Sequence, residues 1–415
     1  MTEAAIHAVA TCDTKGEELA YLAERIRRAG GVVRTVDVGT QGPPVVPVDV
    51  PRERVLAALA TVGGDPAAAL AGLDRGAAVT RMADALAAFL ATEHRAGRVS
   101  AAIGLGGSGG TAILAPAFRG LPLGLPKLVV STLAGGPTGA FVDVSDLVML
   151  PSVVDLAGLN AVSRLVLANA AGAVVGMTAH GAATVAVRES RAAVAMTMFG
   201  VTTPCVTAVR GPLEAEGLDC LVFHATGTGG RALEALVAGG LVSAVLDLTT
   251  TEAADAVAGG IFPAGPDRFR AAGRAGIPCV VSVGAMDMVN FGPPESVPER
   301  YRGRRLHAHN PQITLMRTTP EENVRCGRLL AERLADAAGP LEILLPLRGV
   351  SALDREGGPF YDPEADAALF AEIARLLPDT ATRTVRRIDA HVNAPAFARE
   401  VLAAFARTRK AAGVP

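Results

Sequence analysis

The sequence lacks tryptophan altogether, and Phe, Trp and Tyr together make up only 4% of its 415 residues. This scarcity argues against a binding surface built from aromatic side chains. Half of the residues are apolar, and Ala, Val, Gly and Leu dominate them. Small aliphatic side chains suit the close packing of helices on a sheet, so the composition favours an α/β fold.

The chain also lacks an excess of either charge. Its 39 basic residues nearly balance its 41 acidic ones, and neither sign gathers into a block. Nucleic acids and anionic membranes are held by fields that such a distribution does not create. We therefore expect a small-molecule ligand, with neither a nucleic-acid nor a membrane partner.

Cysteines are few and show no paired spacing. The five thiols form an odd set without a CxxC motif (Cys12, Cys205, Cys220, Cys279, Cys326). A disulfide framework and a zinc ribbon are both disfavoured by this pattern. The N-terminus has no basic stretch followed by an apolar one, so no secretion signal is expected. Together these absences predict a cytoplasmic protein.

No apolar run has the length expected of a membrane span. The most apolar helical stretch extends from about Leu165 to Met177 and carries Arg164 and Asn169. This length is below the roughly 20 residues that a bilayer requires. The stretch is predicted to be a buried helix between two lobes.

Short apolar runs alternate with helical spacing along most of the chain, which predicts mainly parallel sheets with right-handed crossovers. A chain of 415 residues favours two domains. The pattern restarts after the long apolar helix, so we predict an N-terminal α/β subdomain over residues 1–177 and a C-terminal one over 178–415. The segment after about residue 310 could cross back to the first. The predicted fold is two Rossmann-like, doubly wound lobes with a cleft between them.

The first glycine-rich turn directly follows a predicted strand and precedes a helix. Gly104, Gly106 and Gly109 form GxGxxG there, a spacing that lets backbone amides face a phosphate. A dinucleotide site would need an acidic residue about 20 positions later, and none occurs before Asp143. A P-loop would need a lysine at Gly110. The remaining hypothesis is an anion site formed by backbone amides. The alternative is a tight turn that needs glycine only for its backbone conformation. The candidate binding residues are Gly106, Gly107, Ser108, Gly109, Gly110, Thr111, and Ser131 and Thr132 at the end of the next strand.

A second turn has a similar composition. The segment LVFHATGTGGRALEA aligns with AAIGLGGSGGTAILA as strand, small-residue turn and helix, which suggests a weak internal repeat. The second turn adds threonine hydroxyls and a guanidinium that could pair with a phosphate. Its candidate binding residues are Thr226, Gly227, Thr228, Gly229, Gly230 and Arg231. The sequence therefore predicts a pair of turns that bind phosphate.

Three further residues lie where the first strand ends, at the edge where ligands of open parallel sheets bind. Asp13, Thr14 and Lys15 could contact the ligand there, and Lys15 could supply the cation that Gly110 does not. Asp13 could equally be an ordinary helix cap. Arg348, which closes another apolar strand, is a candidate for lining the cleft.

Candidate catalytic groups are scarce. Asp247 ends a strand and precedes three threonines and Glu252, so a carboxylate there could hold magnesium or act as a general base. Helix capping is the alternative. His224 is the third candidate because its surroundings are polar or small, whereas His307 and His309 form no clean zinc motif.

In aggregate these motifs resemble the uncharacterised ATP-binding family that includes the N-terminal region of the tomato mosaic virus resistance protein. The resemblance is carried by ATCDTKGEEL, GLGGSGGTAI, KLVVSTLAGG, SVVDLAGLN, MTMFGVTTPCV, FHATGTGGRALE, DLTTTE, GAMDMVNFG, HNPQITLMRTT and GGPFYDPEAD, in this order. The resemblance implies two Rossmann-like subdomains and a nucleotide site, with ATP as the first ligand to test. It implies no particular reaction.

Three functions stay open on these grounds. The first is an ATP-binding metabolic enzyme, with magnesium as a second cofactor, that handles a phosphorylated or small polar acid substrate. The second is a nucleotide-binding sensor without chemistry, suggested by the missing P-loop lysine. The third is a metal-dependent hydrolase or lyase acting on a sugar-acid-like metabolite. Self-association into a homo-oligomer is expected for helices so rich in Ala, Gly and Val.

Overall fold

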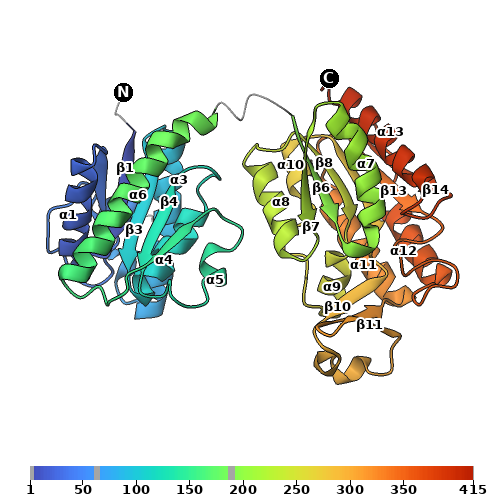
Figure 1. The fold of residues 1–415 in the computed structure, drawn as a ribbon, viewed down its shortest axis with the longest axis horizontal. Helices are drawn as coiled ribbons and strands as arrows, with labels where there is room; N and C mark the ends of the chain where they lie inside the picture. The colour runs from blue at the N-terminus through green and yellow to red at the C-terminus, as the bar shows by residue number, and fades with distance from the viewer. Residues whose placement is uncertain (1–3, 60–65, 186–191, 415) are drawn as a thin grey trace. The chain divides into compact units, whose positions relative to one another are not determined.

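A computed structural model describes residues 4–59, 66–185 and 192–414 of the chain. The chain divides into two compact units, Met1–Glu189 and Ser190–Pro415. Each unit contains a parallel sheet with helices between successive strands (Figure 1). The predicted α/β class with two Rossmann-like lobes is therefore confirmed.

The first unit is built on a five-stranded parallel sheet with the order β2-β1-β3-β4-β5. The six residues of β1 are all buried, as expected for a strand covered on both faces. The strands are β1 (Ala5–Ala10), β2 (Val33–Asp37), β3 (Val99–Gly106), β4 (Lys127–Ser131) and β5 (Val148–Pro151).

Helices cover both faces of this sheet. One face packs against α1 (Cys12–Arg28) and α6 (Ala161–Val185), and the other against α3 (Arg75–Arg95) and α4 (Ser108–Arg119). The chain thus leaves β1 toward one face and the adjacent strand β3 toward the other. That reversal is the topological switch point, where open α/β sheets bind ligands outside the carboxyl ends of their strands. Shorter elements are α2 (Arg52–Leu56), η1 (Pro66–Leu70) and α5 (Gly139–Val142).

The apolar helix α6 is longer than the sequence analysis predicted. It continues past Met177 to Val185, and its stretch Ala161–His180 has the length and composition of a membrane span. The predicted length was therefore wrong. It is the single such helix within the described ranges, and 28% of that stretch is buried. Its buried residues, among them Leu167 and Val174, pack in the core formed with α1.

The second unit contains a six-stranded parallel sheet with the order β14-β13-β9-β8-β6-β7. The last strands belong to this sheet, because β13 pairs with both β9 and β14. The strands are β6 (Ala193–Met198), β7 (Asp219–His224), β8 (Ala244–Thr249), β9 (Cys279–Gly284), β13 (Leu341–Pro346) and β14 (Arg383–Ile388).

One face of the second sheet packs against α7 (Thr203–Ala215) and α13 (Pro395–Ala411). The other face packs against helices α8 to α12. Because β6 leads to α7 and β8 to α9, the switch point of this sheet lies between β6 and β8. The helices on the second face are α8 (Thr228–Ala238), α9 (Glu252–Ala258), α10 (Ala271–Ala275), α11 (Pro320–Leu334) and α12 (Pro363–Leu376).

A small antiparallel sheet follows β9 and was not predicted. Its order is β10-β12-β11, formed by β10 (Met288–Phe291), β11 (Leu306–Asn310) and β12 (Ile313–Arg317). His307 and His309 lie on β11, which is largely exposed. Two 3-10 turns, η4 (Pro294–Ser296) and η5 (Glu299–Tyr301), connect β10 to β11, and η3 (Gly200–Thr202) precedes α7.

Candidate anion-binding site

The first glycine turn lies at the switch point of the first sheet, between β3 and α4. Two of its glycines have a packing role. A Cβ on Gly104 would collide with Leu114, and one on Gly106 would lie 2.8 Å from the Cα of Gly110. These two positions need glycine so that α4 can lie close to β3.

The remaining glycines of this turn have no such packing reason. A Cβ on Gly107 would have Thr132 Oγ1 as its nearest neighbour at 3.8 Å, and one on Gly109 would have Arg75 Nη2 at the same distance. The nearest atom for Gly110 is Leu105 O at 3.6 Å, an ordinary contact. Glycine in a helix costs about 1 kcal/mol relative to alanine. Two such glycines, Gly109 and Gly110, leave space over the start of α4.

The start of α4 offers unpaired donors to this space. Gly107 is the N-cap residue and has no side chain to cap the helix. Within the described residues, the amides of Ser108, Gly109 and Gly110 have no hydrogen-bond acceptor. The helix dipole adds partial positive charge at the same point, so an anion is stabilised there.

Arg75 adds a full positive charge beside this turn. It is the first residue of α3, it is exposed, and its Nη2 lies beside Gly109. In the described part of the chain its guanidinium makes no hydrogen bond or ion pair. Sequence reasoning missed Arg75, since it comes after a long stretch without a motif and only the packing of α3 on α4 brings it to the turn.

Two predicted ligand groups of this turn bind each other instead. Thr111 Oγ1 lies 2.6 Å from Ser131 Oγ, and both side chains are buried. Ser131 Oγ also accepts a hydrogen bond from the amide of Leu133. These hydroxyls therefore brace the turn against the loop after β4, whereas the neighbouring Thr132 is exposed beside Gly107.

The N-terminal turn of α1 flanks the other side of the switch point. Asp13 Oδ2 accepts hydrogen bonds from the amides of Gln41 and Gly42, so it holds the loop after β2 and does not cap α1. Thr14 Oγ1 lies 3.1 Å from Thr11 Oγ1. Lys15 is half-buried at a kink in α1, with φ −127° and ψ 21°.

Asp37, at the end of β2, occupies the N-terminus of α1 and was not predicted. Its Oδ1 accepts hydrogen bonds from the amides of Cys12 and Gly39. Burial raises the pKa of Asp37, and the hydrogen bonds from Cys12 and Gly39 oppose that rise. The start of α1 therefore already faces a carboxylate of the chain, in contrast to the start of α4.

At the second glycine turn, between β7 and α8, the helix start also faces a carboxylate of the chain. Gly227 has a φ of 74°, and its amide donates a 2.7 Å hydrogen bond to Glu252 Oε1. A Cβ on Gly230 would overlap both Glu252 and Arg268, and one on Gly229 would overlap the carbonyl oxygen of His224. A phosphate at this helix start would have to displace Glu252.

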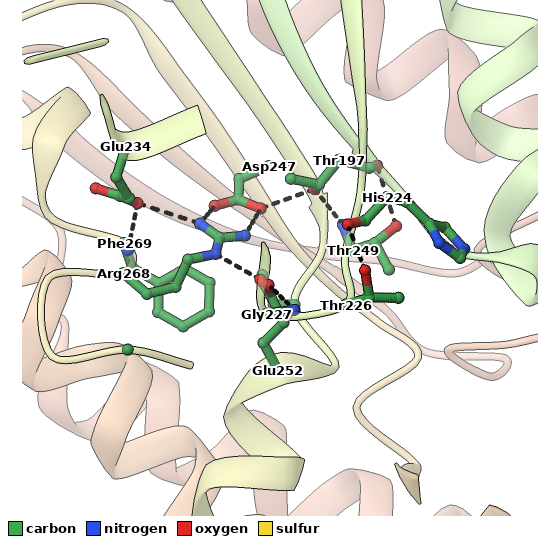
Figure 2. A network of polar contacts seen from close by, with 12 residues as sticks. Thr197, His224, Thr226, Gly227, Glu234, Asp247, Thr249, Glu252, Arg268 and Phe269 are labelled. Carbon is green, nitrogen blue, oxygen red and sulfur yellow. Dashed lines mark hydrogen bonds and ion pairs between the residues drawn. The ribbon is translucent and has the colours of Figure 1, made fainter. Parts of the chain in front are cut away.

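Glu252 belongs to a buried ion-pair network around Arg268 (Figure 2). Arg268 donates to both oxygens of Asp247 and, through Nε, to Glu252 Oε2. Glu234 is the third carboxylate, and it also accepts hydrogen bonds from the amides of residues 269–271. Asp247 and Glu252, predicted as catalytic candidates, are thus engaged with Arg268. In the described ranges, no group of three or more His, Cys, Asp or Glu side chains could hold a metal.

The other residues predicted for the second turn are engaged locally. His224 stacks on Phe199 with ring centroids 5.1 Å apart, and desolvation lowers the pKa of its imidazole. Thr226 Oγ1 and the amide of Thr226 both donate to the carbonyl of His224. Thr228 is exposed, and its amide donates to the carbonyl of Thr226.

Two predicted arginines belong to the second unit. Arg231 is exposed on α8, and its aliphatic carbons lie beside Gly265. Arg348 comes after β13 and forms an exposed ion pair with Asp389, with Nε 2.5 Å from Oδ1. Neither belongs to the unit that contains the first turn.

The two glycine turns are also not topologically equivalent. The first comes after β3, the third strand of its unit, and the second after β7, the second strand of the other. The counterpart of β3 is β8, which leads into Thr250, Thr251 and Glu252. The inferred repeat of the two turns therefore does not correspond to the topology.

The fold and the first turn define a protein of two doubly wound α/β units, one of which has an uncapped helix at its switch point. Two family models cover nearly the whole chain. Residues 4–183 match the N-terminal domain of an uncharacterised protein family, UPF0261, and residues 191–409 match its C-terminal domain. The chain belongs to this family.

Relatives span bacteria and a plant. A UPF0261 protein of Rhizobium meliloti is 53% identical over 400 residues, covering 96% of this chain and 98% of that protein. One from Clostridium tetani is 44% identical, covering 87% of this chain and 88% of its own. The ToMV resistance protein Tm-1(GCR237) of Solanum lycopersicum is 42% identical over 417 residues. That match covers 96% of this chain and 55% of the tomato protein.

Proposed function

We propose that this protein binds a phosphorylated ligand, with ATP the first to test, at the N-terminus of α4. The observation that carries the proposal is the start of α4 itself. Its amides lack acceptors within the described residues, its glycines leave space, and Arg75 stands beside it. A phosphate group meets these donors with charge and with hydrogen-bonding geometry.

The switch point strengthens this assignment. Ligands of doubly wound sheets bind outside the carboxyl ends of the strands where the order reverses, and the turn after β3 lies at that place. Lys15, at the kink in the first turn of α1 on the other flank, is the second cation that the proposal assigns to the ligand. ATP is chosen because the sequence motifs resemble a family described as ATP-binding.

Two functions are compatible with ATP binding. The first is a metabolic enzyme that uses the bound ATP, and the second is a sensor that binds ATP without a reaction. A specific observation favours the sensor. Asp13, Asp37, Asp247 and Glu252 all accept hydrogen bonds from the chain, so each already has a structural role. The metal-dependent hydrolase lacks support, since Asp247 and Glu252 are paired with Arg268.

The proposed binding is tested by calorimetric titration of the purified protein with ATP, with and without magnesium. Arg75→Gln is expected to weaken binding at least about tenfold, because a hydrogen bond to a charged group contributes about 1.5–3 kcal/mol. Arg95→Gln is the matched control, as it removes the same charge from the other end of α3. Equal affinities of the two variants, or no binding by the wild type, would refute the proposal.

A coupled assay for ADP release then separates the two candidates. Turnover would establish the enzyme, and tight binding without turnover would establish the sensor. The five cysteines are all free and buried, which supports the proposed reducing, cytoplasmic location. Self-association remains a prediction, to be checked by sedimentation.

A further inference from the structure

A second buried ion-pair network lies around Arg317 in the second unit. Its carboxylate oxygens outnumber the hydrogen-bond donors that reach them. Arg317 Nη2 lies 2.7 Å from Asp366 Oδ1 and 3.8 Å from Asp354 Oδ1. Asp287 is the third carboxylate, and all three side chains are buried. If all were ionised, three negative charges would face one positive charge in a site removed from water.

The hydrogen bonds show which carboxylate oxygens lack a donor. Ser351 Oγ donates to Asp287 Oδ2, and the amide of Val350 donates to Asp354 Oδ2. Asp287 Oδ1 and Asp354 Oδ1 are buried and have no donor within the described residues. A buried acceptor without a donor is costly, and more so when it carries charge.

The network around Arg268 provides the contrast. It also has three carboxylates for one guanidinium, yet all six carboxylate oxygens receive at least one hydrogen bond from a backbone amide, Thr197 or Arg268. Burial and a shortage of arginines alone therefore do not leave an oxygen without a donor. The oxygens without a donor near Arg317 therefore result from the local arrangement of its three carboxylates.

Asp354 Oδ1 and Asp366 Oδ1 both face Nη2 of Arg317, at 3.8 Å and 2.7 Å, so the two carboxyl groups converge on one nitrogen. Two ionised carboxylates cannot form a hydrogen bond, because neither has a donor. One proton between them supplies the donor that Asp354 Oδ1 lacks and reduces the buried negative charge. We propose that Asp354 and Asp366 share one proton at neutral pH, and that this proton holds the connection between β13 and α12 (residues 347–362) in place.

The contacts of this connection show which part of the fold would respond to loss of the shared proton. Arg317 donates to the carbonyls of Phe360 and Asp362 near its end. The amide of Ala352 donates to Val201 O, in the loop after β6, and His391 Nε2 lies 2.9 Å from Ser351 O. The connection therefore lies against the switch point of the second sheet. Loss of the shared proton would place repelling charges at its base.

Other charged groups near the pair have partners of their own. Arg304, which donates to the carbonyl of Arg317, is paired with Glu322 on α11. Arg305 lies 3.9 Å from the Asp362 carboxylate at the exposed rim. Among the described residues, Arg317 is the one guanidinium that contacts the buried carboxyl groups.

The pKa values have the direction that this arrangement requires. Burial raises the pKa of Asp366 to about 9, with the Asp354 charge adding to the rise and Arg317 opposing it. An acid whose folded-state pKa lies above its unfolded value stabilises the fold at low pH. That stabilisation is lost as pH rises from about 4 through about 9.

Asp366→Asn tests the proposal, because an asparagine side chain imitates a protonated aspartate. Its amide can donate to Asp354 Oδ1 while its oxygen accepts from Arg317. Urea unfolding at pH 7 and at pH 9.5 is expected to show a wild type that loses stability at the higher pH. Asp366→Asn should fold with near wild-type stability at pH 7 and lose clearly less between the two pH values.

Asp247→Asn is the matched control, since each carboxylate oxygen of Asp247 already accepts a hydrogen bond from Arg268 or Thr197. It should be destabilised at both pH values, with the alkaline loss of the wild type retained. An Asp366→Asn protein that behaves like Asp247→Asn would overturn the proposal.

An infrared measurement on the wild type remains decisive if Asp366→Asn does not fold. A carboxylic acid band should persist at pH 8 and disappear on further alkalinisation. Absence of that band at pH 8 would equally overturn the proposal.

Discussion

The two glycine-rich turns look alike in sequence but differ in the groups that face the start of the next helix. Glu252 accepts the amide of Gly227 at the second turn, and its charge is balanced by Arg268. At the first turn, Gly107 has no side chain to cap α4, and Arg75 brings positive charge that no carboxylate of the described residues pairs with. A glycine motif therefore marks close backbone approach in both cases, while only the first turn leaves space for the external anion that we propose.

Among the substitutions that test this comparison, Glu252→Ala is expected to have the largest effect on stability. The substitution leaves Arg268 with one fewer partner in a buried site and removes the acceptor of Gly227. Breaking a buried ion pair in this way costs about 3–5 kcal/mol of unfolding free energy. Chemical denaturation measures the change. Glu214→Ala, which removes one partner of an exposed pair on α7, should change little.

A smaller effect is expected from paired alanine substitutions at the second residue of each helix. Gly229→Ala should destabilise the protein by about 1–3 kcal/mol, because its Cβ would overlap the His224 carbonyl. Gly109→Ala should be neutral or stabilising by up to about 1 kcal/mol, because the nearest described atom outside its own helix, Arg75 Nη2, lies 3.8 Å from its Cβ. Thermal melting of both variants gives the comparison. Similar losses at the two positions would show that the turns are packed alike.

Much of the fold could be predicted from the sequence, because buried parallel strands are continuous apolar runs and their helices come at regular intervals. The small antiparallel sheet could not, since β11 is short, exposed and polar. Helix α6 was predicted too short because its small residues continue without a capping signal beyond Met177.

The candidate site was predictable only in part. The spacing of Gly104, Gly106 and Gly109 located the turn, but the role of each glycine depends on the atoms around it. The partners of Glu252 and Asp247 were not predictable, because Arg268 lies in a loop with no motif. Arg75 is a similar case, since its position results from the packing of α3 on α4.

The smallest effect is expected at Thr111. Thr111→Val removes the hydrogen bond to Ser131 and should cost about 1 kcal/mol of stability. ATP affinity should change little, because the hydroxyl already has its partner. A loss of affinity comparable to that of Arg75→Gln would show instead that Thr111 contacts the ligand.

The central claim is that an external phosphate binds at the first turn, and Gly109→Val tests it most directly. The branched side chain fills the space over the start of α4, while the fold around it has room for a Cβ. Calorimetric titration with ATP should show binding by the wild type and at least about tenfold weaker binding by Gly109→Val, a loss of about 1.4 kcal/mol, with the melting temperature of the unliganded protein retained. Wild-type affinity in Gly109→Val would contradict the claim.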